Sequence, residues 1–138
     1  MILLDTNVLS ELMKLSPNEK VVAMVNTFSI ESSYISAITH AEILQGIALL
    51  TEGKRKKNLA KMADEILMLF ANNTLAFDQR SAPFYADIVQ QRQQKGRPIE
   101  FPDAQIAAIA LQHKTKLLTR NIKDFEGIEG LELMNPWE

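Results

Sequence analysis

The amino-acid sequence predicts an α/β protein, a three-layer sandwich with a central parallel sheet of about five strands. Short apolar segments alternate along the chain with longer segments whose apolar residues recur at helical spacing. Parallel strands require such helix-length connections, because a tight turn cannot return the chain to the same end of the sheet. The 138 residues are 46% apolar and contain no linker, repeat or low-complexity stretch, so a single domain over residues 1–138 is expected.

The expected strands are short and mostly rich in apolar residues. The first, Ile2 to Leu4, is a continuous apolar run, which is typical of a strand buried on both faces of a parallel sheet. The expected strands span residues 2–4, 33–36, 75–77, 116–119 and 131–134.

The segments between these strands are expected to be helices, at residues 7–14, 17–29, 39–50, 54–71, 78–96 and 102–114. Pro17 suits a first helical position, because the N–H that proline lacks has no intrahelical partner there. Asp78 is expected to cap the N-terminus of its helix, with Pro83 delaying the first turns. The segment 54–71 carries an apolar stripe at helical spacing, made of Leu59, Met62, Ile66, Leu69 and Phe70.

Composition excludes several classes of protein. The chain has no cysteine, so disulfides and thiolate metal sites are excluded, and a reducing, cytoplasmic location is expected. No apolar run approaches the ~20 residues of a membrane span, and the first strand leaves no room for a leader. The net charge is only −2, so binding to nucleic acid has to rest on local basic patches.

Asp5 directly follows the first expected strand. An aspartate at this position commonly caps the following helix, and capping alone is a sufficient reason for it. The carboxyl end of a central parallel strand is also where open α/β sheets build their ligand sites, which favours a functional role for Asp5.

Glu42 lies in a segment that is otherwise apolar around most of its helical circumference. Only Thr39, Glu42 and Gly46 line up as a polar or small stripe. A stripe this narrow indicates a crevice, although an ordinary exposed glutamate is the alternative.

Asp103 follows Pro102 in the first turn of an alanine-rich helix. The helix dipole alone stabilises an acid there by roughly 0.3 to 1 kcal/mol. Ile106, Ala107 and Ala110 share its face, however, so the carboxylate is expected against the sheet and in need of a partner.

A divalent cation is the partner that would allow these acids to converge. Zinc normally takes several histidine or cysteine ligands, and this chain offers only His40 and His113, which are far apart in the sequence. Carboxylate ligation suits Mg²⁺, or Mn²⁺, which work with phosphate substrates. Phosphate chemistry is therefore the first hypothesis.

Four segments together resemble PIN-domain ribonucleases, in particular bacterial toxins of the VapC and FitB type. The resemblance covers the whole chain, down to Asn135-Pro136-Trp137. The segments are Leu4-Asp5-Thr6-Asn7-Val8-Leu9-Ser10-Glu11, Ile38-Thr39-His40-Ala41-Glu42-Ile43-Leu44-Gln45-Gly46, Asp103 with Ile106-Ala107-Ala108, and Leu118-Thr119-Arg120-Asn121-Ile122-Lys123-Asp124-Phe125.

The resemblance implies a role for each matching residue. Asp5 and Asp103 match acids that bind the metal, and Glu42 matches the acid that completes the site and positions or deprotonates the attacking water. The family often has a fourth acid where this chain has Asn121, a departure that counts against a second metal ion. Asn121 can still hydrogen-bond a metal-bound water, and Asp124 offers the missing charge. Thr6 and Thr119 match supporting hydroxyl positions.

The activity implied by the resemblance is that of a metal-dependent endoribonuclease toxin, which uses Mg²⁺ or Mn²⁺ to hydrolyse RNA phosphodiester bonds. The implied assembly is a homodimer neutralised by a cognate antitoxin, with operator DNA bound only through the antitoxin. The stripe Leu59, Met62, Ile66 and Leu69 either lines the antitoxin groove or is plain core.

Three basic clusters are candidate RNA contacts: Lys54 to Lys57, then Arg92 with Lys95 and Arg97, then Arg120 with Lys123. Basic runs on amphipathic helices are more often solvated faces, so none is assigned to RNA.

Two other functions remain open from the sequence. A phosphatase of the haloacid dehalogenase type would also begin with an aspartate after its first strand, but it would need a second aspartate at the position of Asn7. A non-catalytic PIN-fold interaction module would not need the three acids Asp5, Glu42 and Asp103.

Overall fold

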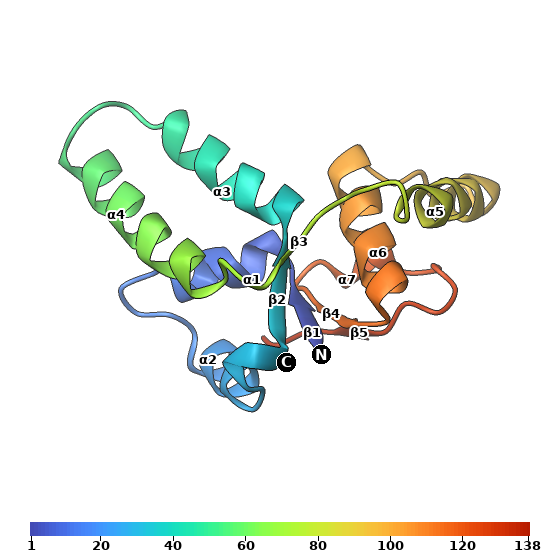
Figure 1. Cartoon of the computed structure of the whole chain (residues 1–138), viewed down its shortest axis with the longest axis horizontal. Coiled ribbons are helices and arrows are strands. Elements are labelled where there is room, and N and C mark those ends of the chain that lie inside the picture. Colours follow the sequence, from blue (N-terminus) through green and yellow to red (C-terminus); the bar gives the residue numbers. More distant parts are fainter.

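The computed structural model describes residues 1–138 and confirms a parallel sheet between two helical layers (Figure 1). The sheet has five strands in the order β3-β2-β1-β4-β5, and every neighbouring pair is parallel. The strands are β1 (Ile2–Leu4), β2 (Ser33–Ser36), β3 (Thr74–Leu75), β4 (Lys116–Leu118) and β5 (Leu133–Met134).

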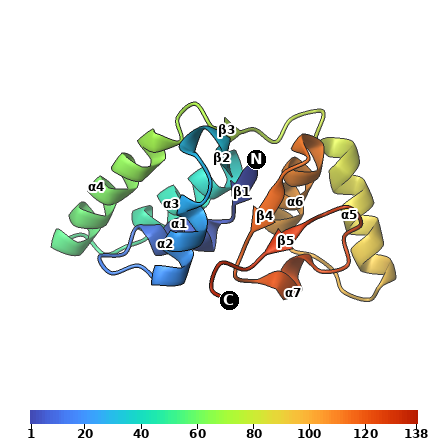
Figure 2. The same cartoon turned by 90° about the horizontal axis from the view of Figure 1, so that it is seen from below.

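Seven α-helices and one 3-10 turn connect and cover these strands. The first group is α1 (Thr6–Leu12), α2 (Glu19–Asn26), the 3-10 turn Ile30–Ser32, α3 (Ala37–Ala48) and α4 (Lys54–Leu69). The second group is α5 (Ala82–Gln94), α6 (Phe101–His113) and α7 (Ile122–Phe125). Figures 1 and 2 show α1 to α4 on one side of the sheet and α5 to α7 on the other. No helix combines the length and apolar character needed to cross a membrane.

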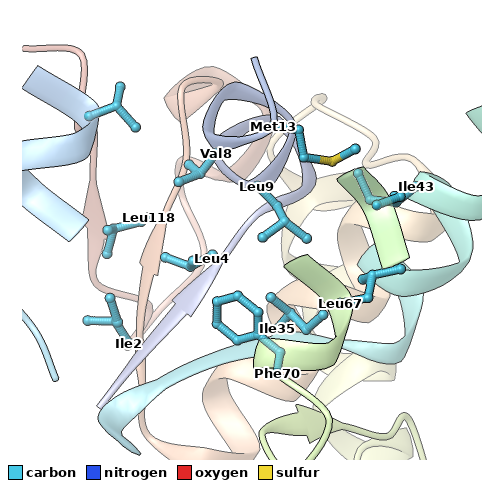
Figure 3. Packing of buried hydrophobic residues seen from close by; sticks show 12 residues of the cluster. Ile2, Leu4, Val8, Leu9, Met13, Ile35, Ile43, Leu67, Phe70 and Leu118 are labelled. Carbon is cyan, nitrogen blue, oxygen red and sulfur yellow. The ribbon is translucent and has the colours of Figure 1, made fainter. Parts of the chain in front are cut away.

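Alternating side chains of β1 divide the core into two clusters, as the pleat of a strand requires. Ile2 and Leu4 join a cluster with residues of α1, α2, α3 and α4, whereas Leu3 joins a cluster with residues of α5, α6 and α7. Figure 3 shows the first cluster, in which Leu9 of α1, Ile43 of α3 and Leu67 of α4 converge on the strands. All three residues of β1 are fully buried, so the apolar run correctly predicts a central strand.

The parallel arrangement brings the carboxyl ends of β1, β2 and β4 to the same edge of the sheet. Leu4 is paired with Leu118 in the register, and the backbone N–H of Asp5 donates to the carbonyl of Leu118 over 2.9 Å. The residues that follow these strands are Asp5, Ala37 and Thr119. The segment that carries Asp5, the helix that carries Glu42 and the segment Thr119 to Phe125 therefore begin side by side.

Two expected helix starts are wrong. Pro17 precedes the helix, because the Asn18 side chain accepts hydrogen bonds from the N–H groups of Lys20 and Val21 and caps α2 instead. Asp78 does not cap α5. Its carboxylate accepts from the N–H of Arg80 in a preceding turn, and the helix begins only at Ala82.

Other boundaries differ by a few residues. Helix α2 ends at Asn26, strand β3 is Thr74–Leu75 instead of residues 75–77, and β5 begins at Leu133. The short helix α7 was not expected from the sequence at all. With four residues it shows no helical periodicity from which it could be predicted.

Candidate active site

Asp5 lies at the N-cap of α1, between that helix and β1, and only 5% of it is exposed. One carboxylate oxygen accepts from the N–H of Thr6 (2.8 Å), and the other accepts from the hydroxyl of Thr119 (2.8 Å) and the amide of Asn7 (3.2 Å). Burial raises the pKa of Asp5, these hydrogen bonds oppose the rise, and the nearby charge of Glu42 adds to it. Asp5 is thus both a helix cap and a buried acid.

Glu42 is joined to the sheet by a chain of hydroxyl groups. Its Oε1 accepts a hydrogen bond of 2.7 Å from the hydroxyl of Thr6. The Thr6 oxygen lies 3.0 Å from the hydroxyl of Thr39, which in turn accepts from the hydroxyl of Ser36 over 3.3 Å. This network fixes the carboxylate of α3 against the residue that follows Asp5. Glu42 itself is partly exposed, so its acid faces a solvent-accessible edge.

Asp103 lies in the first turn of α6 and is partly buried. Desolvation is the main cause that raises its pKa to about 7, and the charges of Asp5, Asp124, Glu42 and Glu100 contribute to this rise in that order. An acid responds in this way only to charges close to it, so the structure brings these four carboxylates into one region. None of them forms an ion pair with lysine or arginine.

The two remaining candidates lie at α7. Asn121 occupies the N-cap position, but its exposed side chain makes no capping hydrogen bond. Its backbone N–H donates to the hydroxyl of Thr119 over 3.0 Å, so Asn121 reaches Asp5 through that threonine. Asp124 is exposed, and its negative charge contributes to the raised pKa of Asp103.

The expectation of three buried acids needs correction, because Asp5 is buried but Glu42 and Asp103 are only partly so. No group of three acidic or histidine side chains is arranged at ligand positions around a single point. The acids at this edge nevertheless offer carboxylate oxygens without ion-pair partners, which fits Mg²⁺ bound through one or two carboxylates with several waters retained.

The sequence did not indicate three of the polar side chains around the acids. Asn7 donates to Asp5 and accepts from the N–H of Arg120 over 3.2 Å, so the position at which a phosphatase would need a second aspartate holds an amide that supports Asp5. Thr39 and Ser36, both fully buried, supply the hydroxyl chain to Glu42. The position of Thr39 in the narrow stripe with Glu42 was a signal that could have identified it.

The three basic clusters differ in their surroundings. In the first, Lys56 pairs with Glu52 over 2.6 Å. Arg92 of the second cluster is only 4% exposed, which excludes it as a direct RNA contact. In the third, the guanidinium of Arg120 lies 5.0 Å from the ring centre of Trp137, a cation–π contact beside the site.

A groove extends from the acids over the neighbouring helices. Thr6 and Glu42 line one part of it, and the other lining residues are Ser10, Met13, Lys14, Ile43, Gly46, Ile47, Leu50 and Leu59. A second hollow beside it is lined by Leu12, Met13, Met62, Glu65, Ile66 and Leu69. The stripe is therefore divided: Leu59, Met62, Ile66 and Leu69 line surface hollows, whereas Phe70 belongs to the first core cluster and Ile66 also packs against it. The core residues within α4 are Ala63 and Leu67.

Comparisons with known proteins agree with this geometry. The family model described as PIN domain matches residues 2–131. The chain is 43% identical to Toxin FitB of Neisseria gonorrhoeae, covering 99% of each chain. It is 40% identical to VapC ribonuclease Y4jK of Sinorhizobium fredii, covering 100% of this chain and 99% of the relative.

Solved structures show the same fold. FitAcB from Neisseria gonorrhoeae superposes with a TM-score of 0.91 at 42% identity, covering 100% of this chain and 99% of that one. VapBC2 from Rickettsia felis, solved with a DNA fragment from its promoter, superposes with a TM-score of 0.82 at 26% identity, covering 98% of each. With the family model, the relatives and the fold in agreement, the chain belongs to the PIN-domain family and resembles its members named FitB and VapC.

Proposed function

We propose that this protein is a toxin with Mg²⁺-dependent endoribonuclease activity, which hydrolyses RNA phosphodiester bonds and is neutralised by a cognate antitoxin. One observation carries the proposal. Asp103, Asp5, Glu42 and Asp124 share one region at the carboxyl edge of the sheet without a compensating cation, and the pKa of Asp103 rises to about 7. Such a concentration of acids suits a divalent cation and a phosphate substrate.

Each residue of the site has a separate role in this proposal. Asp5 and Asp103 hold the cation, with Glu42 completing the site. A bound Mg²⁺ supplies Lewis-acid stabilisation of phosphate charge and acidifies a bound water. Glu42 positions the attacking water and accepts its proton, because it is partly exposed and its other carboxylate oxygen has no protein partner. Thr119 and Thr6 hold the carboxylates of Asp5 and Glu42 in place.

An RNA cleavage assay tests the proposal. The purified chain is incubated with structured RNA in Mg²⁺, in Mn²⁺ and in EDTA, and in parallel with a small phosphoester. Cleavage of RNA alone and only with metal supports the nuclease, whereas phosphoester turnover would support a phosphatase and no reaction a binding module. Asp5→Asn keeps the shape of the side chain and removes its charge, so cleavage should be lost while the fold persists. Asp64→Asn, on the exposed face of α4, is the matched control.

The groove that begins at Glu42 is the proposed binding site for the antitoxin. Half of its lining residues are apolar, namely Met13 after α1, Ile43 and Ile47 of α3, Leu50 after α3 and Leu59 of α4. An occupying segment would cover Glu42, which also lines the groove. Relatives named as toxins, and the solved FitAcB and VapBC2 assemblies, support this partner. Leu59→Glu, which places a charge in the groove, should abolish co-purification with the protein encoded beside the toxin gene and leave RNA cleavage intact. Retained co-purification would place the antitoxin elsewhere.

The proposal also includes a homodimer, a cytoplasmic location, and operator DNA binding through the antitoxin alone. Light scattering of the isolated chain tests the homodimer. Gel-shift assays with operator DNA, with and without antitoxin, test DNA binding, and a shift produced by the toxin alone would contradict binding through the antitoxin.

A further inference from the structure

Three basic side chains of one segment donate to backbone carbonyls of α7 or of the loop that follows it. Arg92 of α5 donates to the carbonyl of Asp124 over 2.6 Å, and Arg97 donates to the carbonyl of Lys123 over 2.9 Å. Lys95, at the C-terminus of α5, donates to the carbonyl of Gly127. Within the cluster that the sequence offered as an RNA contact, Arg92 is buried and Lys95 and Arg97 are exposed, and both arginines bond the helix that carries Asp124.

Arg92 is the unusual member of this cluster. It is 4% exposed and forms no ion pair with a carboxylate, although a buried charge normally requires one. Its Nε donates to the carbonyl of Arg97 over 2.7 Å and its Nη1 to that of Asp124. One guanidinium therefore joins the loop after α5 to α7, and backbone carbonyls replace the missing acid.

The helix α7 needs these donors, because a helix of four residues cannot satisfy its own carbonyl groups. Only the carbonyls of Asn121 and Ile122 receive backbone N–H groups, from Asp124 and Glu126. The next two carbonyls, of Lys123 and Asp124, are the ones bound by the arginines. The buried ring of Phe125 anchors the other face of the helix.

Two hydrogen bonds connect the N-terminus of α7 to Asp5. The N–H of Asn121 donates to the Thr119 hydroxyl (3.0 Å), and that hydroxyl donates to Asp5 (2.8 Å). A rotation of α7 would break the first of these bonds and move the charge of Asp124. Packing by Phe125 restrains the helix at one point, whereas the arginine contacts fix its rotation about its axis.

We propose that Arg92 is a positioning residue for the nuclease site, which acts by clamping α7 so that Asp124 and the N–H of Asn121 keep their places beside Asp5 and Asp103. This inference rests on the proposed function. Arg92 touches neither RNA nor metal in this role. Arg97 is the weaker half of the clamp, because its side chain is 43% exposed and also pairs with Glu126 at 3.3 Å.

The test is a double-mutant cycle on RNA cleavage. Arg92→Met keeps much of the side-chain volume but removes both hydrogen bonds, and kcat should fall by about 10- to 100-fold, as for outer-shell partners of metal sites. KM for RNA should not change, because Arg92 is buried. Arg92→Lys retains one donor and should restore part of kcat. In an Asp124→Asn background, Arg92→Met should cause little further loss, because the two residues act together.

The matched control is Arg80→Met, an exposed arginine before α5, which should leave kcat unchanged. If Arg92→Met does not fold, Arg97→Met takes its place in the cycle and should lower kcat in the same direction by a smaller factor. A loss that is fully additive with Asp124→Asn, or one confined to KM, overturns the clamp.

Failure of the proposed function gives a different result, namely no RNA cleavage by the wild-type chain. The clamp is then judged by hydrogen exchange of the amides of Asp124 and Glu126, which are hydrogen-bonded within α7. Faster exchange in Arg92→Met, or in Arg97→Met, supports the clamp. Unchanged exchange overturns it.

Discussion

Asp103 shows at the level of one residue how a functional charge opposes stability. Its pKa of about 7 in the folded chain lies above the ordinary aspartate pKa of 3.8, mainly because burial removes the carboxylate from water. Between these two values the folded state holds a proton that the unfolded state has released. Stability must therefore fall as pH rises through this interval, and the loss is complete above pH ~7.

We predict that the metal-free protein is more resistant to unfolding at pH 5 than at pH 8. Asp5, whose pKa is also raised, contributes in the same direction. Thermal unfolding in EDTA across this range measures the slope. Asp103→Asn cannot ionise, so it should reduce the slope and raise the melting temperature at pH 8. A variant that is less stable than wild type at pH 8 would show that the charge at this position is compensated.

Thr119 is the second residue for which the structure makes a sharp prediction. It is fully buried, donates to Asp5 and accepts from the N–H of Asn121. Thr119→Val keeps the shape but removes both bonds, and RNA cleavage should fall by about 10- to 100-fold. Thr119→Ser retains the hydroxyl and should recover most of the activity. Equal activity of the valine and serine variants would show that the hydroxyl does not position Asp5.

The sequence predicted the acids of the candidate site and the hydroxyls of Thr6 and Thr119, but not the hydrogen bonds of the other polar side chains around them. Asp5, Glu42 and Asp103 stand out because carboxylates are rare in otherwise apolar segments. Asn7, Ser36 and Thr39 are ordinary polar residues in a sequence, and their hydrogen bonds depend on three-dimensional contacts between β2, α1 and α3.

At the scale of elements, segments with a clear apolar pattern were predicted well, whatever their length. The three residues of β1 are an unbroken apolar run, and α6 is an alanine-rich helix of 13 residues. Helix starts failed where two capping residues compete. Asn18 caps α2 although Pro17 precedes it, and Asp78 closes a turn before α5. Helix α7 depends on donors from Arg92 and Arg97, which no local pattern reveals.

Helix α4 offers a matched test of its two faces. Leu67 is 7% exposed and packs in the first core cluster, whereas Leu69, two residues on, is 65% exposed beside the groove. Leu67→Ala should lower the free energy of unfolding by about 2 to 5 kcal/mol. Leu69→Ala should change it by less than about 0.5 kcal/mol. Urea unfolding of both variants measures the difference, and similar values would contradict the assignment of the faces.

At the scale of the molecule, the candidate site joins the two halves of the sandwich. Asp5 follows the central strand β1, Glu42 comes from α3 on one face, and Asp103 comes from α6 on the other (Figure 1). The two core clusters lie on opposite sides of the sheet and have no member in common. A cation held by these acids would therefore link elements from the two sides of the sheet, in addition to the direct contacts between α3 and α6.

This arrangement predicts that Mg²⁺ stabilises the whole fold and does so in a pH-dependent way. Ligand binding to the folded state alone adds about 1.4 kcal/mol at a concentration tenfold above Kd, which corresponds to roughly 5 °C in Tm for a chain of this size. The increase should be large at pH 8, where Asp103 is ionised, and small at pH 5, where a proton competes for the carboxylate. Thermal unfolding with Mg²⁺ and with EDTA at both pH values measures it, and Asp103→Asn should remove the response while Asp64→Asn retains it. A Mg²⁺ response of equal size at both pH values would mean that the ion binds away from Asp103.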